Sequence, residues 1–182
     1  MPHWSPYLHN RPGHFFSICP MEKQLILFGA QYLYLIIALS VGIFVYSRPK
    51  ELRLKLFLSL VIAFPLTYLI AKIGSVFFES PRPFVLSGVP PLLPHAADNG
   101  FPSDHTLLSA ACAALILWSG KRLGIILMGM AFFVGYARVL AGVHHLVDII
   151  GSMVIATGVA WIVWRYVVPR VSETYFSEKT DK

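Results

Sequence analysis

Long apolar runs alternate with short polar connections along this chain. Leu25–Tyr46 contains no charged residue, and the runs 56–78, 123–143 and 146–167 are almost as apolar. A helix needs about 20 apolar residues to cross a hydrocarbon layer of about 30 Å. Pro65 interrupts the second run and is expected to bend it. The pattern predicts membrane-spanning helices over all four runs.

A further apolar run, 105–118, is shorter than the others. Ser103 as the helix N-cap and Gly120 as its stop are expected to extend this helix far enough to cross the membrane. The predicted fold class is therefore all-α, a polytopic membrane helix bundle with about five transmembrane helices. The membrane domain is predicted to cover residues 25–168.

The connections predict how the bundle is oriented. Residues 1–24 lack the apolar core of a signal peptide and are expected to form an extramembrane or interfacial arm. Residues 79–104 contain six prolines and cannot form one continuous helix, but their apolar side chains favour a folded cap on the membrane. Basic residues in 48–55, 121–122 and the tail 169–182 place these segments in the cytoplasm. The cap is then predicted on the outer face of the cytoplasmic membrane.

Composition supports a membrane protein. The chain is 56% hydrophobic and only 13% charged, whereas soluble domains carry about 25% charged residues. The net charge of +6 could favour nucleic acid, but the basic residues are dispersed between apolar runs rather than clustered, so no nucleic-acid partner is expected. Cys19 and Cys112 form no disulfide or zinc pattern. The oligomeric state is left open.

Polar groups of unusual type are concentrated in the segments predicted to lie outside. Separate spans would bring these groups to one membrane face, and ionisable residues at membrane depth indicate a functional site. They are Arg82, His95, Asp98, Ser103, Asp104, His105, Arg138, His144, His145 and Asp148.

Two pairs of residues predict acid–base and phosphate chemistry. His144 and Asp148 are four residues apart at a helix start, so the carboxylate is expected to accept the Nδ1–H of the imidazole and expose Nε2. An interfacial histidine beside a carboxylate at a helix N-terminus would give the same spacing. Ser103 and His105 lie where a helix begins, and free backbone N–H groups at such a position bind anions.

Three basic residues are candidates for binding a phosphoryl group. Arg82 is held between two prolines, and Arg138 precedes Gly142, where the chain can reverse towards the next helix. Two guanidiniums provide bidentate recognition of phosphate oxygens. Lys72 lies inside the second run. For each of these three residues, a snorkelling interfacial cation is the alternative interpretation.

The three signatures Pro81-Arg82-Pro83, Pro102-Ser103-Asp104-His105 and Arg138-x5-His144-x3-Asp148 resemble the motifs of the type 2 phosphatidic acid phosphatase superfamily. The resemblance covers about 56–167 and is closest to the bacterial undecaprenyl-diphosphatases of the bacitracin-resistance type. One departure is Ser75, which stands where the first motif usually has a lysine. Lys72 lies three residues earlier and could take its place.

The resemblance implies a role for each matching residue. His144 would be the nucleophile that forms a phosphohistidine, Asp148 would orient it, and His105 would be the general acid. Arg82, Arg138 and the Ser103 hydroxyl would hold the phosphoryl oxygens. No metal or other cofactor is expected, because fixed positive donors can stabilise the developing charge. Asp104 either favours the protonated form of His105 or caps the helix.

The resulting hypothesis is a membrane phosphatase that hydrolyses undecaprenyl or another polyprenyl diphosphate at the outer face of the cytoplasmic membrane, recycling a carrier lipid for cell-wall synthesis. One alternative within the superfamily is a phosphatase or phosphotransferase for phosphatidate, phosphatidylglycerophosphate or a lipid A phosphate. An anion transporter would place polar residues through the depth of the spans. A metal-dependent hydrolase would need ligands at compatible spacing, and no HExxH-like pair is present.

Overall fold

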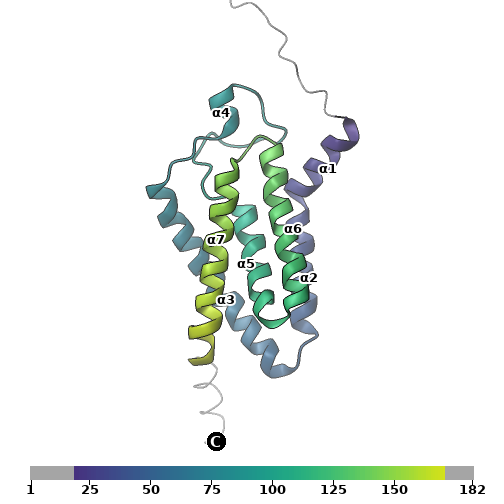
Figure 1. The fold of residues 1–182 in the computed structure, drawn as a ribbon, viewed down its shortest axis with the longest axis vertical. Helices are drawn as coiled ribbons and strands as arrows, with labels where there is room; N and C mark the ends of the chain where they lie inside the picture. Colours follow the sequence, from purple (N-terminus) through teal and green to yellow (C-terminus); the bar gives the residue numbers. More distant parts are fainter. Residues whose placement is uncertain (1–18, 171–182) are drawn as a thin grey trace, which may run out of the picture.

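The computed structural model describes residues 19–170, and these form a bundle of roughly parallel and antiparallel helices (Figure 1). No strand forms among them; Pro81 and Asn99 make a single isolated bridge. The predicted all-α class is confirmed. The elements are α1 Pro20–Gln31, α2 Leu33–Tyr46, α3 Lys50–Phe77, α4 Pro83–Ser87, α5 Asp104–Ser119, α6 Lys121–Leu140, α7 Leu146–Ile162 and the π-helical turn Val163–Val167.

Three helices are long and apolar enough to cross a membrane: α3, α6 and the continuous helix Leu146–Arg170. The first predicted span is not one straight helix, because α1 and α2 meet at Tyr32 with a bend of 47°. Counted together, this pair gives a fourth span. The first helix begins at Pro20, so it takes in five residues of the segment predicted as the arm. Residues 1–18 of that segment lie outside the described residues.

The helix α5 lies at the centre of the bundle and is shorter than a full span. Its 16 residues cover about 24 Å at about 1.5 Å per residue, less than the roughly 30 Å of a hydrocarbon layer. The helix has the predicted N-cap and stop residues, Ser103 and Gly120, but by length alone it is not among the helices that could cross a membrane. Figure 1 shows that α5 begins deeper in the bundle than the neighbouring ends of α6 and α7. The turn containing His105 is therefore recessed into the bundle.

Small residues allow the helices around α5 to approach closely. Ala110, Ala113 and Ala114 are fully buried, and α5 packs against both α6 and α7. A Cβ atom on Gly135 of α6 would lie 2.3 Å from Ile149 and 2.8 Å from the Thr106 hydroxyl. Membrane helices associate through such small residues. This close approach brings the C-terminal end of α6 next to the starts of α5 and α7.

The cap, residues 79–104, covers the end of the bundle at which α5 and α7 begin (Figure 1). Asn99 fixes the cap to the end of α3, because its amide donates to the carbonyls of Ser75 and Phe78, both at 3.0 Å. The Asn99 side-chain oxygen accepts from the backbone N–H groups of Ser80 and Phe101. Four hydrogen bonds from one side chain thus set the path of the chain on either side of the cap.

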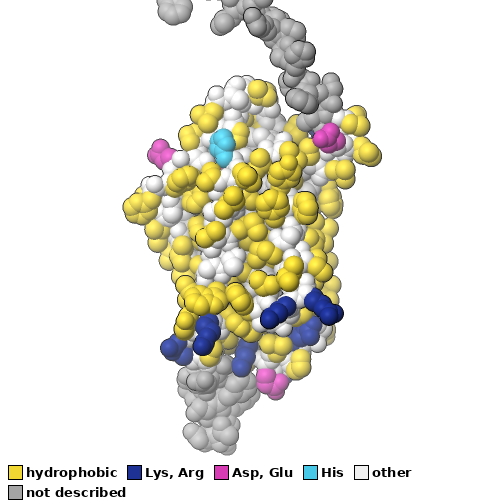
Figure 2. Space-filling view, viewed as in Figure 1, with side chains coloured by type: hydrophobic (Ala, Val, Ile, Leu, Met, Phe, Trp, Pro, Cys, Tyr) yellow, Lys and Arg dark blue, Asp and Glu magenta, His cyan; other side chains and the backbone are white. Residues whose placement is uncertain are grey.

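Lys and Arg side chains gather at the opposite end of the molecule, where α3 begins and the last helix ends (Figure 2). Between this end and the cap, the visible face is largely hydrophobic. Many large apolar side chains of the described helices are exposed, among them Phe57, Leu69 and Val154. A surface of this kind suits lipid rather than water.

Candidate active site

His144 lies in the turn between α6 and α7 and is 2% exposed. Gly142 makes this turn with φ of +77°, a conformation that favours glycine. The Nδ1 atom of His144 is 2.9 Å from the carbonyl oxygen of Gly100 in the cap. Because a carbonyl can only accept, Nδ1 is assigned the ring proton, and the lone pair of Nε2 faces Arg82 Nη1 at 3.5 Å. The backbone therefore sets the tautomer that a nucleophilic Nε2 requires.

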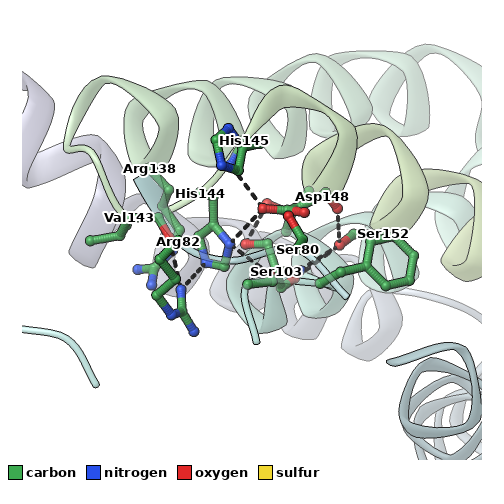
Figure 3. A network of polar contacts seen from close by, with 12 residues as sticks. Ser80, Arg82, Ser103, Arg138, Val143, His144, His145, Asp148 and Ser152 are labelled. Carbon is green, nitrogen blue, oxygen red and sulfur yellow. Dashed lines mark hydrogen bonds and ion pairs between the residues drawn. The ribbon is translucent and has the colours of Figure 1, made fainter. Parts of the chain in front are cut away.

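Asp148 lies behind His144 and is fully buried. Its Oδ2 is 3.5 Å from His144 Nδ1 and accepts the backbone N–H of His145 at 2.8 Å. The sequence predicted that Asp148 itself receives the Nδ1–H, but the short hydrogen bond goes to the Gly100 carbonyl. Asp148 is a nearby negative charge, and as the third residue of α7 its carboxylate accepts the backbone N–H of the N-cap residue His145. Figure 3 shows His144 between Asp148 on one side and Arg82 on the other.

The surroundings of His144 favour its neutral form. Burial lowers the pKa of this imidazole below its ordinary value of 6.5. The positive charges of Arg138 and Arg82 lower the pKa further, while Asp148 opposes them in part. A neutral imidazole with a free Nε2 is the form that can attack phosphorus.

Arg82 reaches His144 from the cap side. Its Nη1 donates to the Val143 carbonyl at 2.8 Å and lies 3.5 Å from His144 Nε2. Its Nε donates to Asp98 at 2.7 Å. Partial burial raises the pKa of Asp98, but this hydrogen bond and the charge of Arg82 outweigh it and hold the pKa below the usual value. Asp98 thus stays ionised beside Arg82.

Arg138 comes from the last turn of α6 and is 4% exposed. Its Nη1 donates to the carbonyl of Ala30 at 3.3 Å. Ala30 is in the last turn of α1, where carbonyls lack partners within the helix, so the bend at Tyr32 provides this acceptor. The Nε of Arg138 is buried and has no hydrogen-bond partner among residues 19–170. This donor can take an anionic oxygen.

These side chains surround a polar pocket of about 220 Å³, called here the phosphate pocket. His105 and Lys72 both reach it; His105 packs edge-on against Tyr34 of α2 at 4.9 Å between ring centroids. The Nζ of Lys72 lies 5.2 Å from the Tyr68 ring centroid, one turn earlier in α3. The pocket is lined by Lys72, Ser75, Arg82, His95, Asp98, Asn99, Phe101, Pro102, Asp104, His105, Arg138 and His144.

Ser103 differs from the prediction. It is fully buried and is not among the residues that line the phosphate pocket. Its hydroxyl accepts from Thr106 at 3.1 Å and makes no side-chain cap of α5, while its backbone N–H donates to Ser152. Its contacts join the starts of α5 and α7 instead of facing the pocket. The prediction of a Ser103 hydroxyl for the phosphoryl group is not supported by this geometry.

Two contributions to the site have little signal in the sequence. Gly100 acts through its carbonyl, and a Cβ there would lie 2.9 Å from the Ser80 carbonyl and 3.1 Å from Asp148, so the position needs a small residue. Asn99 anchors the cap through four hydrogen bonds. An Asn-Gly pair is typical of an ordinary turn. The sequence alone therefore does not indicate either role.

The geometry supplies an imidazole with an unprotonated nitrogen facing the pocket, a second imidazole on the same pocket and two guanidiniums for an anion. This set of groups matches phosphoryl transfer through a histidine. Residues 54–172 match the family described as the PAP2 superfamily. The chain belongs to the PAP2 superfamily. Its predicted family and enzyme class, a membrane phosphatase, are thereby confirmed.

Individual members of the PAP2 superfamily resemble the chain over most of its length. "Undecaprenyl-diphosphatase BcrC" of Bacillus subtilis (strain 168) is 31% identical over 158 residues, which cover 82% of this chain and 80% of that protein. An "Undecaprenyl-diphosphatase" of Sulfolobus acidocaldarius is 27% identical over 137 residues, covering 74% of this chain and 64% of that protein.

A solved structure from the PAP2 superfamily has the same fold. The crystal structure of Aquifex aeolicus LpxE superimposes with a TM-score of 0.65 at 26% identity and covers 83% of this chain and 90% of that one. Within residues 19–170, no group of three His, Cys, Asp or Glu side chains is placed to hold a metal ion.

Proposed function

We propose that this protein hydrolyses a polyprenyl diphosphate, of the undecaprenyl type, to the monophosphate and inorganic phosphate. The observation that carries the proposal is the position of two apolar cavities relative to the phosphate pocket. A cavity of about 540 Å³ between α3 and α5 shares Asp104 with that pocket. It shares Phe64 and Leu108 with a second cavity of about 870 Å³ that extends along α2 and α3 to Lys50.

Together these two cavities form what we call the apolar groove. Its apolar wall includes Pro65, Tyr68, Leu107, Phe57 and Val41. A groove that begins beside the phosphate pocket and continues along the helices fits a ligand with a phosphorylated head and a long hydrocarbon chain. The names of the B. subtilis and S. acidocaldarius relatives support a diphosphate lipid as that ligand.

In the reaction, Nε2 of His144 attacks the terminal phosphorus, and the bond from phosphorus to the bridging oxygen breaks. His105 gives its proton to that oxygen, and the polyprenyl monophosphate leaves. His105, now unprotonated, takes a proton from water as the water oxygen attacks the phosphohistidine. The phosphorus–nitrogen bond breaks, phosphate is released, and both imidazoles return to their starting forms.

The charged groups lower the barrier of both steps. Arg82 and Arg138 neutralise the oxygens of the transferred phosphoryl group, and Lys72 is within the same pocket to add a third positive charge. Asp148 stabilises the positive charge that develops on His144. These groups are in place before the substrate arrives, so little reorganisation is needed.

The substrate is tested by initial rates of phosphate release from purified protein. Polyprenyl diphosphate, farnesyl diphosphate and phosphatidate are compared in the same detergent. The proposal predicts the highest kcat/KM for polyprenyl diphosphate, and a clear preference for phosphatidate would overturn it.

The active site is proposed to face outwards, since the basic end of the molecule lies opposite the cap and basic ends of spans stay in the cytoplasm. Ser87→Cys in the cap and Ser119→Cys at the other end, each in a Cys19→Ser background, test this orientation. In intact cells an impermeant maleimide should label the first variant and not the second. The reverse pattern would place the site in the cytoplasm.

A further inference from the structure

Each of the two arginines of the phosphate pocket is held by one side chain of the cap. Asp98 accepts from Arg82, as described above, and His95 contacts Arg138. The distance from His95 Nε2 to Arg138 Nη2 is 3.0 Å. Because a guanidinium can only donate, the Nε2 atom of His95 must be the acceptor and carries no proton. The mechanism described above gives His95 no part.

The two arginines differ in how firmly they are held. Arg82 also donates to the carbonyls of Val143 and Asn99. Arg138 has only one further hydrogen bond among the described residues, the 3.3 Å contact to the Ala30 carbonyl, and its Nε is unpaired. Two guanidiniums in one pocket also repel each other. Without His95, little would keep the Arg138 side chain directed at the pocket.

His95 contacts the nucleophile His144 as well as Arg138. Its ring meets the ring of His144 edge-on, with 6.0 Å between centroids, and it lines the same pocket. Partial burial lowers the pKa of His95, and the positive charges of Arg82 and Arg138 lower it further, so the neutral acceptor is favoured. Geometry and charge both favour a hydrogen bond to Arg138 over a proton on Nε2.

We propose that His95 is a positioning residue: its unprotonated Nε2 holds the Arg138 guanidinium in the orientation that receives the phosphoryl group. The inference rests on the proposed function only in assigning Arg138 to phosphate, and not on which lipid carries that phosphate. His95 acts through Arg138 and transfers no proton.

The test compares His95→Gln, which keeps a side-chain acceptor, with His95→Leu, which has similar bulk and no acceptor. The affinity of the purified full-length protein for inorganic phosphate is measured by calorimetry in detergent. His95→Leu should weaken phosphate binding about tenfold, the size expected when a hydrogen bond to a charged group is lost. His95→Gln should remain within about threefold of wild type. In turnover, His95→Leu should raise KM more than it lowers kcat.

A double-mutant cycle with Arg138→Gln separates positioning from direct contact with phosphate. If His95 acts through Arg138, His95→Leu should have little further effect once Arg138 is replaced. A full effect in that background would overturn the proposal, as would wild-type affinity in His95→Leu. His95→Ala replaces the leucine variant if the latter does not fold.

His145→Gln is the matched control, because the His145 side chain contacts the Pro81 carbonyl at 3.0 Å and does not reach Arg138. It should leave phosphate affinity within about twofold of wild type. A tenfold loss would show that loosening the cap is by itself enough to weaken phosphate binding. Measuring phosphate binding also allows the proposed lipid substrate and the proposed role of His95 to fail independently. A wild-type protein that binds phosphate but does not hydrolyse polyprenyl diphosphate refutes the lipid substrate and leaves the role of His95 testable.

Discussion

Replacing Asp148 by Asn removes a charge while preserving the shape of the site. Asn Oδ1 can take the place of Asp148 Oδ2 and accept the backbone N–H of His145, which keeps the start of α7 intact. The amide nitrogen then occupies the position of Oδ1, which accepts no hydrogen bond in the described part of the chain. The carbonyl of Gly100 still receives the Nδ1–H of His144. The variant therefore changes charge without changing the tautomer.

The size of the effect follows from the distance between the two groups. Unit charges 3.5 Å apart attract each other by about 4.7 kcal/mol at an effective dielectric constant of about 20. If about half a positive charge has developed on His144 in the transition state, the loss is about 2.4 kcal/mol. A loss of this size corresponds to about a fiftyfold decrease in kcat.

The assay is phosphate release at saturating substrate, with thermal melting in detergent to confirm that the variant is folded. When a carboxylate alone fixes the histidine tautomer, as in the serine protease triad, the same substitution costs about 10⁴-fold. A loss that large here would show that the Gly100 carbonyl does not hold the tautomer. A loss under about threefold would show that His144 does not sense the Asp148 charge.

Three further predictions concern pH, the groove and metal. Because the pKa of His144 is lowered and the nucleophile must be neutral, the decrease of kcat/KM on the acid side should have its midpoint below pH 6.5, and an acid midpoint above 6.5 would contradict this. Gly42→Phe fills open space in the apolar groove and should lower kcat/KM about fivefold for polyprenyl but not farnesyl diphosphate, since only packing contacts are lost to lipid. Gly158→Phe, at an equally open position outside the groove, is its control, and equal losses in both variants would exclude the groove as the chain site. Chelators should leave turnover unchanged, and inhibition reversed by added metal would favour a metal-dependent route.

The apolar runs were sufficient to predict the helices but not their details. The start of α7 at Leu146 and the turn before it were predicted because polar residues interrupt the apolar pattern there. The bend at Tyr32 was not, since Leu25–Tyr46 is apolar throughout and contains no proline. A Cβ on Gly29 would lie 3.0 Å from Ala137, so the path of α1 depends on its contact with α6. Tertiary packing of this kind leaves no local signal.

The sequence indicates the parts of the site that consist of charged side chains but not the parts formed by the backbone. His144, Asp148, Arg82 and Arg138 converge as expected, since each has a side chain whose charge or spacing identifies it. The carbonyls of Gly100 and Ala30 accept key hydrogen bonds, yet every residue has a carbonyl, and only the fold selects these two. Ser103 was assigned from its motif, but the approach of Ser152 from α7 buries it. Helix contacts thus decide which polar atoms face the pocket.

The most direct test of the central claim is rapid-quench trapping with polyprenyl diphosphate labelled on its terminal phosphate. Acid-labile, base-stable label should appear on the wild-type protein within one turnover. It should persist longer in His105→Ala, which lacks the group that activates water, and be absent from a folded His144→Ala variant. Label on His144→Ala, or turnover without any label on the wild-type protein, would contradict a phosphohistidine at His144.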